Sequence, residues 1–225
     1  MRLALDASQT SGSIALEDAG RVVYSACFDI DITHSEALMP QVDHALKFCG
    51  FRPADISTLL LTLGPGSFTG LRIGLATAKG IAYGLKIPLL TFDTLRLCSL
   101  ARYHCRRRIL AVLDAKMKEI YAALYDENLC EIEAPRVCSP EEIADWDLEN
   151  CYVLGSGAPI IAPVFQNRKL ETISVPSQPL NAAGLFTLAE LFPQNESYDF
   201  DRLARLDPLY LRESTAQIRR RLQPR

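Results

Sequence analysis

The residues of this chain best suited to chemistry form a glycine-rich run, GPGSFTGLRIG, at residues 64–74. Glycine-rich turns that open helices bind phosphate groups, because their backbone N–H groups can approach a ligand closely. The run nevertheless fails both common phosphate-loop patterns. One pattern needs glycines five residues apart and then a lysine, and the other needs a glycine where Thr69 stands. The segment is therefore either a different anion site or a helix shaped to approach another surface closely.

Metal and nucleophilic chemistry have less support. The three histidines are His34, His44 and His104, and no two of them have the i, i+4 spacing that places a metal-binding pair on one helix face. Ser67 lies in GPGSFTG, which departs from the G-x-S-x-G pattern of serine hydrolases, and no histidine can be identified as its base. We therefore expect no catalytic residue and no metal site, and we interpret Ser67 as a helix N-cap.

Hydrophobic runs and turn residues predict alternating strands and helices in the first half of the chain. Three strands joined by tight turns come first, and Asp18-Ala19-Gly20 predicts a hairpin turn between the second and third. The strands are expected over 3–6, 13–17, 21–28, 58–63 and 89–92. The helices are expected over 34–49, 68–85 and 94–100, the last with Asp93 as its N-cap. The order β-β-β-α-β-α is that of an RNase H-like lobe.

The second half of the chain repeats the first at an offset of 108 residues. Leu5-Asp6-Ala7 recurs as Leu113-Asp114-Ala115, and Ala15-Leu16 recurs as Ala123-Leu124. The offset is close to half the chain length, as a duplication predicts. We therefore predict an α/β protein of two RNase H-like lobes, the actin-like ATPase (ASKHA) fold, with the second lobe reduced.

The boundaries of these lobes follow from the same pattern. The N-terminal lobe is expected to span 1–103 and the C-terminal lobe 104–207. Residues 208–225 are expected to pack back near the N-terminal lobe and to form a helix over 211–222. The helices expected in the C-terminal lobe span 140–146, 160–165 and 182–192, the first capped by Ser139 and the last by Asn181.

Asp6 and Asp114 end the first strand of each predicted lobe, where actin-like proteins place the aspartates of a nucleotide cleft. Ser8 and Thr10 follow Asp6 in a turn rich in hydroxyl groups. The turn after Asp114 has lysines and no glycine, so bulky side chains would keep its N–H groups away from phosphate. We interpret Asp6, Ser8, Thr10 and Asp114 as a candidate vestigial nucleotide cleft. An actin-like ATPase or small-molecule kinase acting on its own is the alternative.

The predicted helix over 68–85 carries two stripes of small residues. They are Gly70, Gly74, Ala78 and Ala82 in one stripe, and Ala76, Gly80 and Gly84 in the other. An interior glycine costs a helix about 0.5–1 kcal/mol relative to alanine, so these positions need a reason. Either both stripes pack within the protein, or one meets the sheet and the other meets a partner's helix. Leu38 and Met39 of the preceding helix, which Pro40 should kink, add an apolar edge.

Composition restricts the partners. The net charge of −3 argues against nucleic-acid binding through a broad basic face. Two basic runs, at 106–108 and in the tail with Arg219-Arg220-Arg221 and Arg225, are either solvated or contact a charged partner. The seven cysteines include no C-x-x-C pair, which argues against a disulfide framework or a zinc site. No apolar run approaches the ~20 residues of a membrane span, so a cytoplasmic protein with no membrane partner is expected.

Several motifs occur in the order found in a known family. They are LALDAS at 3–8, HSEALMP at 34–40, GPGSFTGLRIG at 64–74, KGIA at 79–82, IP at 87–88, DAKMKEIY at 114–121 and PLYLR at 208–212. On these motifs the chain resembles the TsaB (YeaZ) family over essentially its whole length, and 64–74 is the most specific match. One departure is Lys118, which stands where the family pattern has glycine and so leaves the local turn uncertain. Old peptidase labels in this superfamily find no support in these residues.

The resemblance implies an actin-like fold and a non-catalytic scaffold subunit of the machinery that forms threonylcarbamoyladenosine on tRNA beside the anticodon. The partner TsaD, a longer relative that keeps a metal-binding histidine pair, would perform the transfer, and the ATPase TsaE would join. ATP and a divalent metal are accordingly expected on the partner subunits, and no cofactor on this chain. tRNA would be contacted only indirectly or weakly, and direct binding through the arginine tail is a third hypothesis.

The resemblance also implies where the partner binds. In the family, TsaB and TsaD meet through the first two helices of each N-terminal lobe, which are about 34–49 and 68–85 here. The implied interface residues are His34, Ser35, Glu36, Leu38, Met39, Val42, Phe68, Leu71, Arg72, Gly74, Leu75, Ala78 and Ala82. A homodimer through the same helical face is the alternative for the isolated chain.

Overall fold

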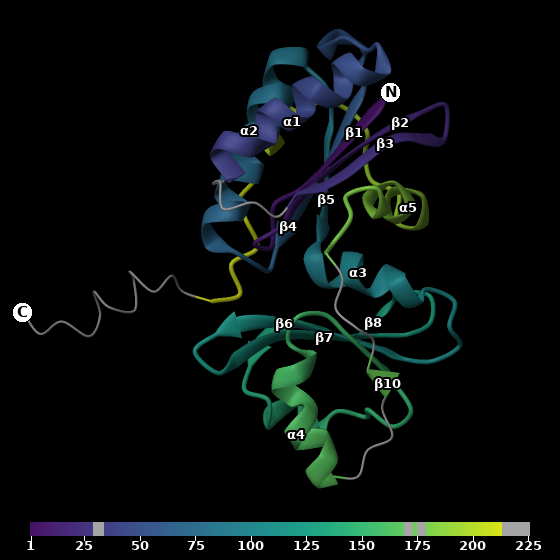
Figure 1. The fold of residues 1–225 in the computed structure, drawn as a ribbon, viewed down its shortest axis with the longest axis vertical. Coiled ribbons are helices and arrows are strands. Elements are labelled where there is room, and N and C mark those ends of the chain that lie inside the picture. Colours follow the sequence, from purple (N-terminus) through teal and green to yellow (C-terminus); the bar gives the residue numbers. More distant parts are fainter. Residues whose placement is uncertain (29–33, 169–172, 175–178, 213–225) are drawn as a thin grey trace, which may run out of the picture.

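Two five-stranded mixed sheets form the frame of the protein (Figure 1). The computed structural model describes residues 1–28, 34–168, 173–174 and 179–212. The first sheet has the order β3-β2-β1-β4-β5 and the second the order β10-β9-β6-β7-β8. The strands of the first are β1 (Arg2–Asp6), β2 (Gly12–Asp18), β3 (Arg21–Phe28), β4 (Thr58–Gly64) and β5 (Leu89–Asp93). Those of the second are β6 (Ile109–Lys116), β7 (Glu119–Tyr125), β8 (Glu131–Cys138), β9 (Tyr152–Leu154) and β10 (Ile173–Ser174).

The two sheets have the same topology. In each, the first strand pairs antiparallel with the second, which pairs antiparallel with the third. In each, the first strand also pairs in parallel with the fourth, and the fourth with the fifth. The predicted duplication of an RNase H-like lobe into an actin-like fold is therefore confirmed, and Asp6 and Asp114 lie in equivalent strands, Asp6 at the end of β1 and Asp114 two residues before the end of β6.

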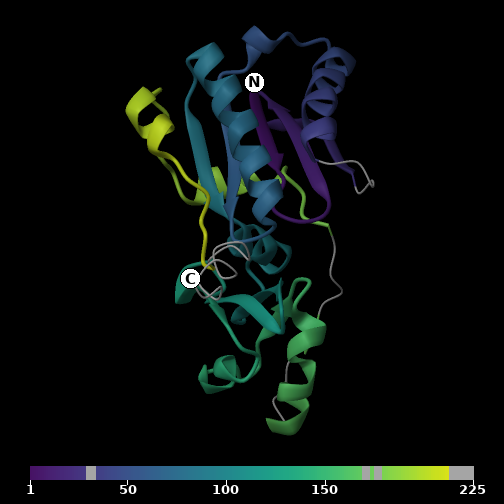
Figure 2. The same cartoon turned by 90° about the vertical axis from the view of Figure 1, so that its left-hand side faces the viewer.

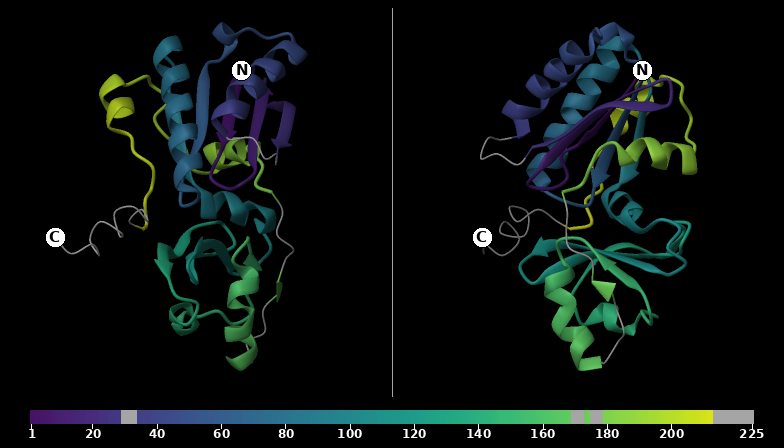
Figure 3. Two further views of the ribbon diagram at one scale, coloured as in Figure 1. Left: turned by 60° about the vertical axis from the view of Figure 1, so that its left-hand side comes forward. Right: turned by 45° about the vertical axis from the view of Figure 1, so that its right-hand side comes forward.

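Helices pack on the faces of the two sheets, and two of these helices lie between the sheets (Figures 1 and 2). They are α1 (His34–Cys49), α2 (Phe68–Leu85), α3 (Thr94–Ser99), α4 (Ala158–Arg168), α5 (Gly184–Leu191) and α6 (Phe200–Arg205), with short 3-10 turns at Pro53–Asp55, Leu100–Arg102 and Glu142–Asp145. Because strand side chains alternate, Leu3 and Leu5 of β1 pack with α1 and α2. Ala4 faces the opposite layer, where α3 and α5 lie between the two sheets. Helix α4 covers the outer face of the second sheet (Figure 3).

Two predicted caps are confirmed. The hydroxyl of Ser67 accepts the Gly70 N–H at 3.2 Å at the start of α2. The carboxylate of Asp93 accepts the Arg96 N–H at 2.7 Å at the start of α3. Both side chains satisfy backbone donors that a first helical turn leaves free.

Two predicted helices of the second half differ in the structure. In place of a helix over 140–146 there is a single 3-10 turn, Glu142–Asp145, because the backbone becomes extended at Trp146. Helix α5 begins at Gly184, later than predicted, because Asn181 closes a local turn by accepting the Ala183 N–H at 2.9 Å.

The predicted boundary of the second lobe also differs. Helix α5 packs on β4, β5 and α3, and α6 packs on α2, so both helices lie on the first lobe although they fall within 104–207. The reason is apolar area: the face of the first sheet with Leu60 and Leu90 is covered by Leu185 and Leu188 of α5. The helix predicted over 211–222 falls mostly on residues 213–225, outside the described residues, and Leu211 and Arg212 form a bend.

Candidate functional site

The carboxylate of Asp6 serves the fold. Asp6 is 1% exposed, and its Oδ1 accepts the backbone N–H of Ser8 at 3.1 Å and the hydroxyl of Thr62. Ser8 is fully buried, whereas Thr10 is exposed. The structure therefore places two of the four predicted cleft residues, Asp6 and Ser8, in the interior.

The glycine-rich turn lies directly on the turn that follows Asp6. The Ser67 N–H donates to the Ser8 carbonyl at 2.7 Å. A Cβ atom at Gly66 would lie 2.0 Å from that carbonyl oxygen, so only glycine fits. The close approach that the glycine permits is thus between two segments of this chain.

Asp114 repeats this arrangement near the end of β6. Its Oδ1 accepts the Lys116 N–H at 2.7 Å, and its Oδ2 pairs with the Lys116 ammonium at 2.7 Å. Partial burial raises the pKa of Asp114, but the hydrogen bonds and charge of Lys116 outweigh it and hold the pKa below its usual value. Both first-strand aspartates therefore close the turn that follows them.

The hairpin between β6 and β7 forms with Lys118 at the position where the family pattern has glycine. Lys116, Met117 and Lys118 all have left-handed backbone conformations, with φ angles of 64°, 53° and 65°. A side chain disfavours this conformation, so Lys118 is held where glycine is easiest to accommodate. The turn that the sequence left uncertain is therefore formed.

The four predicted cleft residues do not line one cavity. A cavity of about 210 Å³ lies between the lobes, and of the four only Thr10 lines it. Its other walls are Gln9, Ser11, Cys98, Leu113, Gly155, Ser156, Pro179 and Leu180. The described lining contains no lysine or arginine. Gly155 lies close to β6, because a Cβ added at Gly155 would be 2.3 Å from the Val112 carbonyl oxygen. The predicted nucleotide cleft and this cavity therefore share Thr10 alone.

The inner stripe of α2 belongs to the protein's own core. Gly70, Gly74, Ala78 and Ala82 are buried, and a Cβ at Gly74 would lie 3.3 Å from the Cβ of Ala7. The small residues let α2 lie close to β1 and β4. The predicted interface residues that are buried in the isolated chain are Leu38, Val42, Leu71, Gly74, Leu75, Ala78 and Ala82.

The outer stripe of α2 is open. Ala76, Gly80 and Gly84 are exposed, and no other atom would lie within 4 Å of a Cβ added at Gly80 or Gly84. Tyr83 is 60% exposed beside this stripe, and its ring centroid lies 5.8 Å from that of Phe200, which is 53% exposed on α6. The two glycines of this stripe therefore have no packing role among the described residues.

The remaining predicted interface residues have mixed environments. Met39 and Arg72 are exposed and Phe68 is half-buried. His34, Ser35 and Glu36 lie in the first turn of α1, and their side chains are outside the described part of the structure.

Sequence analysis gave no role to Phe200 or Tyr210. The ring of Tyr210 lies 4.8 Å from that of Phe68, and its hydroxyl accepts the Arg72 Nε–H at 2.8 Å. The sequence signal for Tyr210 is the PLYLR motif at 208–212, which indicates the family and does not predict this contact.

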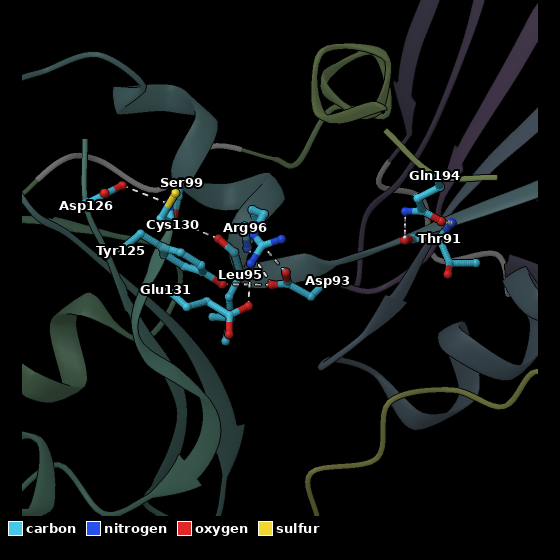
Figure 4. A network of polar contacts seen from close by, with 10 residues as sticks. All are labelled: Thr91, Asp93, Leu95, Arg96, Ser99, Tyr125, Asp126, Cys130, Glu131 and Gln194. Carbon is cyan, nitrogen blue, oxygen red and sulfur yellow. Dashed lines mark hydrogen bonds and ion pairs between the residues drawn. The ribbon is translucent and has the colours of Figure 1, made fainter. Parts of the chain in front are cut away.

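A partly buried polar network joins the lobes (Figure 4). The Tyr125 hydroxyl of β7 donates to Asp93 at the end of β5, at 3.0 Å. Arg96 pairs with both Asp93 and Glu131, and its guanidinium lies over the Phe192 ring at 4.6 Å. Burial raises the pKa of Asp93 and outweighs the opposing hydrogen bond and charge of Arg96. Burial also raises the pKa of Tyr125.

Comparison with known proteins follows this geometry. The profile of the family described as "TsaD: tRNA N6-adenosine threonylcarbamoyltransferase" matches residues 30–194. A Haemophilus influenzae relative, the tRNA threonylcarbamoyladenosine biosynthesis protein TsaB, is 30% identical over 169 residues, which cover 69% of this chain and 71% of the relative. The chain belongs to the TsaB (YeaZ) family. The Escherichia coli protein of the same name is 37% identical over 131 residues, so the match spans 56% of each chain, just over half of that relative.

Solved structures support the TsaB family from the fold. YeaZ from Pseudomonas aeruginosa has a TM-score of 0.77 and 25% identity, covering 93% of this chain and 99% of that one. A second Pseudomonas aeruginosa structure, described as similar to peptidase YeaZ, has a TM-score of 0.80 and 26% identity, with coverage of 94% and 99%. In this TsaB-family chain, the family-specific segment 64–74 is thus the turn that packs on Ser8 and the first part of α2.

In the described ranges, no three or more His, Cys, Asp and Glu side chains are grouped so that they could hold a metal ion. The described helices also include none with the length and apolar character of a membrane span.

Proposed function

We propose that this chain is a non-catalytic subunit of the machinery that forms threonylcarbamoyladenosine on tRNA, and that it pairs with TsaD through the outer face of α2. The observation that carries the proposal is the open stripe of Ala76, Gly80 and Gly84. Glycine weakens a helix by about 0.5–1 kcal/mol relative to alanine, and among the described residues no atom would lie within 4 Å of a Cβ at Gly80 or Gly84. A partner helix crossing there would use this space, because small residues let two backbones approach closely.

The names of the relatives supply the pathway. The Haemophilus influenzae and Escherichia coli relatives are named as tRNA threonylcarbamoyladenosine biosynthesis proteins. In the proposed complex TsaD carries the transfer chemistry, TsaE joins as an ATPase, and ATP and the divalent metal are held by those subunits. This chain works in the cytoplasm and contacts tRNA indirectly or weakly.

The absence of catalysis in this proposal follows from how the aspartates are used. Asp6 and Asp114 bind the backbone N–H groups of their own turns, and Gly66 fills the space beside Ser8. The rival function, an independent ATPase or kinase, needs these groups to be available to a nucleotide. Its test is calorimetry with ATP and Mg²⁺, where tight binding and turnover by the isolated chain would favour the rival.

The pairing is tested by mixing the purified chain with TsaD and measuring mass by light scattering. Wild type should form a heterodimer. Gly80→Leu adds a side chain in open space, so it should fold normally and fail to pair. Gln166→Leu, on the exposed face of α4 in the second lobe, is the matched control and should pair like wild type. Failure of the wild-type chain to pair with its cognate TsaD contradicts the proposal, and a homodimer broken by Gly80→Leu would assign the face to a second copy.

A further inference from the structure

Residues 208–212, which we call the C-terminal strap, pass from the first lobe to the second. Figure 2 shows this yellow segment descending beside α2 toward the second lobe. Four consecutive residues, Leu209 to Arg212, each contact a different part of the molecule. These four residues bridge the first sheet and the hairpin of the second sheet.

The first contact of the strap is with the end of β4. The Leu209 N–H donates to the Leu63 carbonyl at 2.7 Å. The Leu209 carbonyl oxygen would lie 3.0 Å from a Cβ at Gly64, whose φ angle is 115°. Gly64 therefore satisfies two needs, a left-handed turn and room for the strap.

The second contact is with the first turn of α2. The ring of Tyr210 packs on Phe68, and the Arg72 guanidinium lies 3.9 Å from the centre of the Phe68 ring while it donates to the Tyr210 hydroxyl. Stacked aromatic rings and a cation over a ring are each attractive. Tyr210 thus covers two residues, Phe68 and Arg72, that the sequence analysis assigned to the partner interface.

The third and fourth contacts are with the core between the lobes and with the second lobe. Leu211 packs against the hydrophobic cluster that both lobes share. Arg212 donates to the Ala115 carbonyl at 2.8 Å and pairs with Glu119 at 3.2 Å. These two partners lie on opposite sides of the hairpin in which Lys116, Met117 and Lys118 are left-handed. Arg212 therefore clamps the base of a hairpin whose backbone is intrinsically unfavourable.

We propose that the strap couples the second lobe to the first turn of α2, so that the grip of Arg212 on the hairpin holds Phe68 and Arg72 in place. The strap is short and each of its residues is anchored, so the release of one end removes the support of the other. The second lobe thereby shapes a surface to which it does not itself belong.

The test is amide hydrogen exchange on the full chain, without any partner. Arg212→Ala removes only the contacts with the hairpin. Amide exchange should become about tenfold faster at Leu209, because Arg212→Ala removes one hydrogen bond to a charged group. Exchange should also become faster at Gly70 and Leu71 of α2. Tyr210→Ala should act in the reverse direction and speed exchange in the 115–119 hairpin, because coupling is reciprocal.

Two controls make the outcome decisive. Phe200→Ala removes an exposed ring that touches α2 at Tyr83, away from the strap, and should leave Leu209 unchanged. A variant has kept its fold if its amide exchange at Leu60, in the centre of β4, equals that of wild type. If Arg212→Ala does not keep its fold, Arg212→Lys is used instead, because lysine keeps the charge and lacks the planar guanidinium group. Faster exchange confined to 115–119, with Leu209 and Gly70 as in wild type, overturns the proposal.

The consequence for the partner rests on the proposed function. Arg212→Ala should weaken pairing with TsaD about tenfold, whereas Gln166→Leu, on the exposed face of α4, should pair like wild type. If wild type pairs and Arg212→Ala pairs equally well, the role of the strap in pairing is overturned. If wild type does not pair at all, the proposed function fails, and the exchange experiment still decides the coupling.

Discussion

Asp6 and Asp114 occupy equivalent positions in the two lobes and make the same hydrogen bond. Each lies in the last part of the first strand of its sheet, and the Oδ1 of each accepts the N–H of the residue two positions later, at 3.1 Å and 2.7 Å. Their surroundings differ, because Asp6 is buried and also accepts the Thr62 hydroxyl, whereas Asp114 is partly exposed and pairs with Lys116. The duplication has therefore kept the turn-closing role and varied the burial.

This difference predicts unequal costs for the same substitution. Asp6→Asn should lower the free energy of unfolding by about 1–3 kcal/mol, because it places an amide donor in a buried acceptor site. Asp114→Asn should change it by less than about 1 kcal/mol, since an exposed ion pair contributes little. Urea unfolding of both variants measures the difference. If both variants change the free energy of unfolding by the same small amount, and Asp6→Asn also abolishes ATP turnover, the result would instead support nucleotide binding by Asp6.

The hairpin predicts a stabilising substitution. Lys118 has a φ angle of 65°, which glycine adopts without the steric cost that a side chain incurs. Lys118→Gly should therefore raise the free energy of unfolding by up to about 1 kcal/mol, or about 2–4 °C in melting temperature for a chain of this size. Lys118→Ala is the control, because it removes the charge and keeps the strained backbone. A larger gain from alanine than from glycine would show that charge, not conformation, matters there.

The junction network predicts a pH dependence of stability. Burial raises the pKa of Asp93 above its ordinary value of 3.8, so the folded protein holds this proton more tightly than the unfolded chain does. Stability from this group is then fully present below about pH 3.8 and is lost as the pH rises through the folded pKa. Asp93→Asn cannot titrate and keeps an oxygen for the Arg96 N–H. The unfolding free energy of wild type should therefore fall relative to Asp93→Asn as pH rises from 3.5 to 7, and a rise would reverse the assigned direction.

The fold was predictable because its signals are local and repeated. The recurrence of Leu-Asp-Ala, the capping residues Ser67 and Asp93, and the apolar run of β4 each predict an element without knowledge of its neighbours. The positions of α5 and α6 were not predictable in this way. Which sheet a helix packs on is decided by the apolar area left uncovered, here around Leu60 and Leu90, and that area exists only after both sheets have formed.

The sequence predicts the helix that forms the candidate site, but it does not predict which face of that helix is exposed. Periodicity showed two stripes on α2 but did not say which one meets the sheet. The structure distinguishes them through Gly74, where a Cβ would press on Ala7, and Gly80, where it would meet nothing. The contact of Tyr210 with Phe68 was also out of reach, because the two residues are far apart in the sequence and no local pattern links them.

The two glycines predict opposite outcomes, and these separate internal packing from partner binding. Gly74→Leu should destabilise the chain by about 1–3 kcal/mol or more, because the added atoms press on Ala7 and Leu61. Gly80→Ala should stabilise the isolated chain by about 0.5–1 kcal/mol, since alanine favours the helix and has open space around it. The proposed function adds that Gly80→Ala should nevertheless weaken pairing with TsaD, because its methyl group keeps the partner backbone away. Thermal unfolding measures the first effect and titration calorimetry with TsaD the second. A variant that is both more stable and equally well paired would show that Gly80 does not serve the partner, whereas greater stability with weaker pairing would explain why the helix keeps a residue that its own folding does not need.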